Sequence, residues 1–230
     1  MLADVKSAYP WDLDKSPFKG YDKRYIEDKL SSTGFDMNIK KPDDATIVKL
    51  DKLLEGFFGQ DALNWAVVFS NDMTFLSHLA LAIPVAFSMS TKRRSFVTTT
   101  DKLFHNFLGA IQASKNYEFE QMTREQRYAE NVKEAGLLVW EQLSVSSAGS
   151  IKYSGKYSSI LQHRQLYNLP TIFTVHSPKI SAKKVNIEQF FSGIATKIGD
   201  TNADHIKQSS MMIWMMVKPK KVTLVNMGDM

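Results

Sequence analysis

The sequence predicts an α/β domain with a mostly parallel sheet. Two observations support this fold class. Short apolar runs of strand length recur along the chain, and segments with helical periodicity separate most of them. Strands that alternate with helices pair in parallel and are covered on both faces, so their sequences are continuously apolar. The 230 residues suffice for one such domain and an additional arm.

The expected strands follow one another as apolar runs over 65–69, 95–99, 137–140, 171–174, 211–217 and 222–225. The last two form a strand pair, with residues 218–221 (KPKK) as the turn between them. The methionines of the fifth run suit the interior of a strand, because an unbranched thioether fills irregular gaps in a core.

The expected helices lie before and between these strands, over 46–58, 76–88, 102–114, 123–134, 155–168 and 187–198. Pro84 is expected to kink or break the second helix, because proline lacks the N–H that a helix needs. Asp101 precedes the third helix and is its expected N-cap, because a carboxylate there accepts a hydrogen bond from the first turn.

Residues 1–45 lack a sustained period and carry prolines, glycines and isolated aromatic side chains. We expect this segment to be an N-terminal arm that packs over a core or docks onto a partner, and residues 46–230 to be the core domain. The candidate docking residues are aromatic side chains of the arm: Tyr9, Trp11, Phe18, Tyr21 and Tyr25.

The charge of the chain is unevenly distributed. Lys and Arg number 29 against 24 Asp and Glu, and residues 146–230 hold 11 basic and 4 acidic side chains, a balance of 11 − 4 = +7. This excess fits either a solvated surface or an anionic partner such as nucleic acid. No signal peptide or spanning segment is recognisable, so a cytoplasmic location without a membrane partner is expected.

Two classes of site are excluded or disfavoured by composition. The chain has no cysteine, which excludes disulfides, thiolate metal ligands and a cysteine nucleophile. No pair among its five histidines has the H-x-x-x-H spacing that places two ligands on one helix face, so no metal site is expected.

The turn after the first strand is where a parallel α/β sheet usually binds phosphate. A phosphate-binding loop of the form G-x-x-x-x-G-K-[ST] needs glycines for close backbone approach, a lysine for charge and a hydroxyl for the metal. Residues 69–80 read FSNDMTFLSHLA, without glycine or lysine, and Asp72 would repel phosphate. Only Ser77 could supply the hydroxyl, so ordinary nucleotide binding is not expected.

Five segments in order resemble the DnaC/DnaI-type bacterial helicase loaders and the related IstB transposition ATPases. SHLA at 77–80 is similar to the [ST]-H-L-A that follows the phosphate lysine of that family. The other segments are FVTTTDKL at 96–103, LLVWEQLS at 137–144, LPTIFTVHS at 169–177 and IATKI at 194–198. The third resembles the Walker B strand, and the last resembles the segment that carries the trans-acting arginine.

The resemblance implies a P-loop NTPase core of the AAA+ type: a central, mostly parallel five-stranded sheet flanked by helices, here with the N-terminal arm. DnaA-like initiators share this core and remain close alternatives. The resemblance spans about residues 60–225, most of the chain.

The positions that match the nucleotide site of the family have lost its chemistry. Leu76 takes the place of the phosphate lysine, and Ser77 that of the metal-binding hydroxyl. Glu141 stands at the magnesium aspartate, and Gln142 at the acidic residue that activates water. The remaining two positions are the sensor asparagine, now His176, and the arginine finger, now Lys197. Glutamine cannot accept the proton, and lysine lacks the bidentate fork of arginine.

We therefore expect a non-enzymatic pseudo-ATPase without a cofactor. By resemblance it would act in DNA replication, in a phage or mobile-element setting, by binding a replicative helicase or its loader, with single-stranded DNA as a further partner. Two alternatives stay open: a DNA-binding structural subunit of a replication or transposition complex, and an ATPase whose missing charge is replaced by Lys92 or Lys197. The candidate nucleic-acid contacts are basic loop residues: Lys92, Arg93, Arg94, Lys183, Lys184, Lys218, Lys220 and Lys221.

Overall fold

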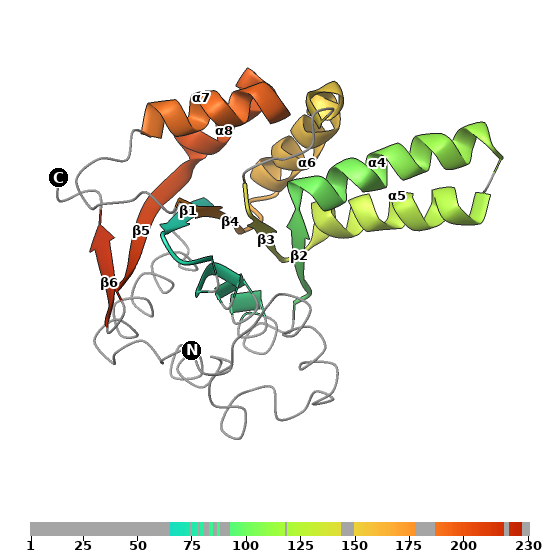
Figure 1. Cartoon of the computed structure of the whole chain (residues 1–230). Coiled ribbons are helices and arrows are strands. Elements are labelled where there is room, and N and C mark those ends of the chain that lie inside the picture. The colour runs from blue at the N-terminus through green and yellow to red at the C-terminus, as the bar shows by residue number, and fades with distance from the viewer. Residues whose placement is uncertain are drawn as a thin grey trace.

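Six strands form one sheet in the order β2-β3-β4-β1-β5-β6 in the structure, a computed structural model (Figure 1). Their bounds are Trp65–Ser70 for β1, Ser95–Thr99 for β2, Leu137–Glu141 for β3, Thr171–His176 for β4, Ser210–Lys218 for β5 and Lys221–Asn226 for β6. The first five strands are parallel, and β6 pairs antiparallel with β5. The predicted parallel five-stranded core is confirmed, and β6 adds an antiparallel edge.

The structure describes residues 65–73, 75–77, 79–80, 83–84, 87, 93–117, 119–143, 150–177, 187–218 and 221–226. The predicted arm 1–45, the predicted helix 46–58, and Lys92, Lys183, Lys184 and Lys220 lie outside these residues. The boundary between arm and core therefore stays a prediction.

The helices are α4 (Thr100–Lys115), α5 (Phe119–Glu134), the short 3₁₀ helix η3 (Ser150–Tyr153), α6 (Ser154–Leu166), α7 (Ile187–Ile198) and α8 (Asp200–Ser209). Figure 1 shows α4, α6, α7 and α8 on one side of the sheet and the helical residues that follow β1 on the other. Helices α4 and α5 form a hairpin that projects beyond the sheet (Figure 1). The flanked α/β architecture expected from the sequence is confirmed.

Strand β1 lies at the centre of the sheet and is buried along its whole length. Its alternate residues Trp65, Val67 and Phe69 belong to one core cluster with apolar side chains of α4 to α8. The intervening Ala66 and Val68 are also buried, on the opposite face of the strand. The continuous apolar sequence of β1 thus reflects burial of both faces, as predicted.

The start of α4 differs from the prediction. Strand β2 passes directly into the helix, and Thr99 has extended backbone angles, φ −123° and ψ 161°. The Thr99 Oγ1 accepts a hydrogen bond of 3.0 Å from the Lys102 N–H, which makes Thr99 the N-cap. Asp101, the predicted cap, lies inside the first turn, where its charge favours the helix N-terminus. The prediction was wrong because the helix starts at Thr100, two residues earlier than expected, so that the capping position falls on the last strand residue.

Two further elements bear on the predictions. Ile83, Pro84 and Phe87 are all helical, and the kink or break at Pro84 stays a prediction because residues 81–82 and 85–86 lie outside the described ones. Helix α7 has the predicted bounds, and Gly199 follows it with φ 94°, a backbone conformation that only glycine adopts easily. Helix α8 starts directly after this glycine and was not predicted, because its polar sequence DTNADHIKQS lacks an apolar stripe.

Arg164 in α6 is a fully buried arginine that joins four elements of the fold. Its guanidinium donates to five oxygens: Val132 O at 3.1 Å, Lys133 O at 3.1 Å, Ala135 O at 2.8 Å, Pro170 O at 2.6 Å and Thr171 Oγ1 at 2.8 Å. These oxygens belong to the end of α5, the connection to β3 and the start of β4.

The charge of Arg164 is compensated by these oxygens and by the nearby carboxylate of Glu134. Burial lowers the pKa of Arg164 to about 9, which leaves the guanidinium protonated at neutral pH. Carbonyls at the C-terminus of α5 carry the negative end of the helix dipole, so they stabilise a cation held against them. The last turn of α5 and the first residue of β4 are thereby fixed to α6.

Replacement of Arg164 tests this role. Arg164→Ala leaves several buried acceptors without a donor and opens a cavity, so the free energy of unfolding should fall by about 3–5 kcal/mol. Urea unfolding followed by circular dichroism measures the change. The matched control Arg127→Ala removes an exposed arginine and should change stability by no more than about 0.5 kcal/mol. Equal losses in both variants would contradict the role.

Candidate degenerate nucleotide site

The carboxyl ends of β1, β3 and β4 meet at one edge of the sheet. Ser70 at the end of β1 is paired in register with His176 at the end of β4, and Glu141 ends the neighbouring strand β3. Open parallel sheets bind their ligands at this edge. The resemblance-based positions Ser77, Glu141, Gln142 and His176 are all on segments that end or begin there.

The turn after β1 is short, and side chains of the turn accept hydrogen bonds from nearby backbone N–H groups. The strand ends at Ser70 and helical residues begin at Met73. The Asp72 Oδ1 accepts a hydrogen bond of 2.9 Å from the Phe75 N–H, and the Asp72 carbonyl accepts one of 3.2 Å from Leu76 N–H. The Ser70 Oγ accepts a 3.2 Å bond from the Asp72 N–H. Asp72 is therefore an N-cap with the usual geometry.

This cap occupies the place where a phosphate-binding loop presents its amides. A P-loop leaves the N–H groups at the start of the helix free for the anion, whereas here the carboxylate of Asp72 binds one of them. Phe75 and Leu76 are buried in the core at 4 % and 1 % exposure. Leu76, which the resemblance places at the phosphate lysine, is thus a core side chain.

Ser77 and Glu141 are brought together by the fold. The Ser77 hydroxyl donates to the Glu141 Oε1 at 3.0 Å, although the two residues are 64 positions apart. Burial raises the pKa of Glu141, and the hydrogen bond from Ser77 partly opposes that shift. In P-loop ATPases the equivalent hydroxyl and carboxylate hold Mg²⁺. Here they contact each other directly.

Gln142 is held in an unusual backbone conformation directly after this pair. Its φ is 50°, in the left-handed region that residues other than glycine seldom adopt. Its N–H donates to Thr174 Oγ1 at 3.0 Å, and the next N–H, of Leu143, donates to the Thr174 carbonyl at 2.8 Å. Thr174 of β4 therefore fixes the chain as it leaves β3. Sequence reasoning missed Thr174, because a buried strand threonine carries no signal of its own.

The other predicted residues are more widely separated. Lys197 is partly exposed in the last turn of α7. Arg93 and Arg94 precede β2, at the amino end of one edge strand, and the Arg93 guanidinium lies 5.9 Å from the centre of the Phe87 ring. Lys218 and Lys221 are paired in register where β5 ends and β6 begins, at the opposite edge of the sheet. The described basic residues thus do not form one continuous site.

Within the ranges given above, no group of three or more His, Asp or Glu side chains is placed to hold a metal ion. None of the helices in those ranges is long and apolar enough to span a membrane.

Removal of the cap at Asp72 tests its contribution to the site. Asp72→Ala leaves the Phe75 N–H without its acceptor, so the free energy of unfolding should fall by about 1 kcal/mol, within a range of about 0.5–2. Urea unfolding measures the loss. Asp72→Asn keeps an acceptor oxygen and should lose less than the alanine variant. An alanine variant as stable as the wild-type protein would show that the carboxylate does not cap the helix.

No model of a known protein family matches the sequence, and no curated protein matches it significantly. Solved structures do match. The DnaC helicase loader aligns with 86% of this chain and 100% of its own at 16% identity and a TM-score of 0.55. DnaI aligns with 80% of this chain and 88% of its own at 15% identity and a TM-score of 0.52.

The replication initiator DnaA bound to AMPPCP and single-stranded DNA aligns with 80% of this chain and 49% of its own, at 12% identity and a TM-score of 0.52. These similarities agree with the resemblance found in the sequence. The chain therefore has the fold of the DnaC helicase loader.

Proposed function

We propose that this protein is a pseudo-ATPase with a helicase-loader fold that acts in DNA replication by binding a replicative helicase or its loader. One observation supports the proposal: at the positions that the resemblance assigns to phosphate and metal, the protein's own groups contact each other. Asp72 caps the helix where phosphate would bind, and Ser77 donates to Glu141 where the metal would lie between them.

The positions that the resemblance assigns to the other groups needed for ATP hydrolysis also hold side chains unsuited to that chemistry. ATP hydrolysis in this fold needs a cation against the β- and γ-phosphates and a group that orients the attacking water. Leu76 is uncharged and buried, and the Gln142 amide cannot act as a base. Asp72 adds a negative charge where the substrate is most negative. These features favour a protein that binds partners over an enzyme.

The proposed partners follow from the solved structures of similar fold. One of these is described as a helicase loader, and another as an initiator bound to single-stranded DNA. We propose the aromatic residues of the arm 1–45 as the helicase-docking element. The lysines at 218 and 221, opposite each other at the β5–β6 turn, are the proposed contacts for single-stranded DNA, together with Lys220. They would bind through phosphate and give affinity that falls steeply with salt.

Isothermal titration calorimetry with ATP and Mg²⁺ tests the loss of the nucleotide site. We expect no binding heat from the wild-type protein at millimolar ATP, because the carboxylate of Asp72 and the absence of the lysine both disfavour a polyphosphate. The DnaC helicase loader serves as the control for the assay. Binding in the micromolar range would overturn the pseudo-ATPase proposal and favour a site in which Lys92 or Lys197 supplies the charge.

A pull-down with the replicative helicase of the native host tests the proposed partner. Alanine at Trp11, Tyr21 and Tyr25 together should abolish or strongly reduce retention, because aromatic anchors dominate such interfaces. Tyr167→Ala is a matched control, since Tyr167 is an aromatic residue of the core domain that is 61% exposed. Undiminished helicase binding by the triple variant would remove the arm from the proposal. Failure of the wild-type protein to retain either helicase or loader would overturn the function itself.

A further inference from the structure

A groove lies where the α4–α5 hairpin meets α6, away from the sheet edge that holds the carboxyl ends of β1, β3 and β4. Its volume is about 540 Å³, within the range of pockets that hold small ligands or single side chains. Phe107 of α4 and Ile160 of α6 are buried residues of its lining. Ile111 is 41% exposed in the groove, so its aliphatic side chain is accessible to a partner placed there.

Positive charge is in excess in this groove once the acidic residues that pair within the protein are set aside. Glu130 forms an ion pair of 3.6 Å with Lys133. Glu125 is hydrogen bonded by Asn106 and lies 3.4 Å from Arg124. Both acidic residues of the lining are thereby compensated by neighbours.

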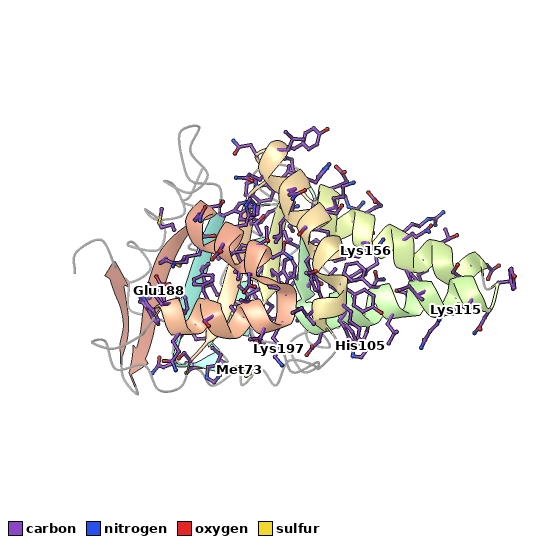
Figure 2. All side chains as sticks on the ribbon, turned by 90° about the horizontal axis from the view of Figure 1, so that it is seen from above. Met73, His105, Lys115, Lys156, Glu188 and Lys197 are labelled. Carbon is purple, nitrogen blue, oxygen red and sulfur yellow. The ribbon has the colours of Figure 1, made fainter. Side chains whose placement is uncertain are left out.

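Two lysines remain at the rim of the groove. Lys115 is in the last turn of α4 and Lys156 near the start of α6, and both are exposed. Figure 2 shows Lys115 at the outer end of the hairpin and Lys156 close to where α6 crosses it. Neither lysine has a carboxylate partner among the residues that the structure describes.

We propose that this groove is a docking site for an acidic amphipathic helix of a partner protein. An apolar side chain of the partner would enter beside Ile111, and carboxylates on its flanks would meet Lys115 and Lys156. From Phe107 to Lys115 the groove follows α4 for about 12 Å, or roughly two helical turns. This length accommodates apolar residues at i, i+3, i+4 and i+7 of a partner helix. The proposal does not depend on the pseudo-ATPase assignment.

The composition of the groove favours a peptide over nucleic acid. Proteins bind the phosphate backbone through wet, strongly basic surfaces, and single-stranded bases stack on exposed aromatic rings. Here the aromatic residue of the lining, Phe107, is only 7% exposed. The accessible apolar surface comes from Ile111, Ala110 and Ala129, and aliphatic side chains with two flanking ammonium groups complement an acidic amphipathic helix.

Fluorescence anisotropy with a synthetic probe tests the proposal. The probe is a fluorescein-labelled peptide of about 16 residues, long enough to populate a helix, with leucines along one face and glutamates elsewhere. We expect saturable binding to the full-length protein. A peptide with glutamine in place of every glutamate should bind at least about fivefold more weakly, because it loses the rim ion pairs.

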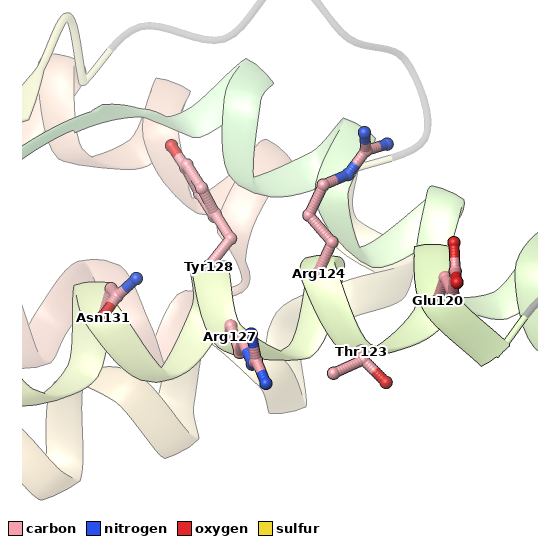
Figure 3. Close-up of a pocket in the computed structure, with 6 residues that line it drawn as sticks. All are labelled: Glu120, Thr123, Arg124, Arg127, Tyr128 and Asn131. Atoms are coloured by element: carbon pink, nitrogen blue, oxygen red, sulfur yellow. The ribbon is translucent and has the colours of Figure 1, made fainter.

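Charge reversal locates the binding. The double variant K115E/K156E should weaken binding of the glutamate peptide about tenfold or more. The matched control R127E/K152E carries the same change in net charge at exposed residues outside the groove. Arg127 instead lines a separate hollow on α5, shown in Figure 3 with Thr123, Arg124 and Tyr128. A third variant, Ile111→Glu, places a carboxylate in the groove itself and should also abolish binding.

Three results would overturn the proposal. The first is the absence of saturable binding of the glutamate peptide to the wild-type protein. The second is an equal loss of affinity in K115E/K156E and R127E/K152E, which would indicate unspecific attraction. The third is binding of a labelled single-stranded oligonucleotide to the wild-type protein that only K115E/K156E abolishes. That result would assign the groove to nucleic acid.

Discussion

The buried guanidinium of Arg164 is the constraint on which the arrangement of this fold depends. A charge taken out of water must find oxygens in fixed places. The five that Arg164 contacts come from the end of α5, from the connections that lead to β3 and β4, and from the first residue of β4. These contacts hold the end of α5 and the starts of β3 and β4 against α6. The same two strands carry Glu141 and Thr174 further along, and Gln142 follows β3.

The edge so formed brings together side chains that the resemblance assigns to a nucleotide site. The fold still brings a hydroxyl and a carboxylate from distant segments into contact, as Ser77 and Glu141 show. Strand pairing and core packing need apolar side chains at alternating positions, whereas phosphate binding needs glycines and a cation in one turn. These two sets of requirements act on different residues, so a chain can lose the second set and retain the first.

The sequence allowed much of the fold to be predicted, because the strands β1, β3 and β4 are buried on both faces and read as unbroken apolar runs. Helix α7 was predicted to the residue since its apolar stripe ends at a glycine. The polar helix α8 and the N-cap Thr99 were not predicted from the sequence. Each depends on a few side chains whose roles are set by their neighbours in space. Within the site, the resemblance pointed to Ser77 and Glu141, but their mutual hydrogen bond and the role of Thr174 required the three-dimensional structure.

The cap at Asp72 also determines how strongly a dissolved anion could compete for the start of that helix. Asp72 belongs to the same chain as the N–H group it binds, with only two residues between them, so its carboxylate is present there at a high effective concentration. Tethering over short distances corresponds to concentrations of about millimolar or more. Any phosphate compound in solution must compete with this internal carboxylate for the Phe75 N–H. The first partner of this helix start is therefore supplied by the polypeptide itself rather than by its surroundings.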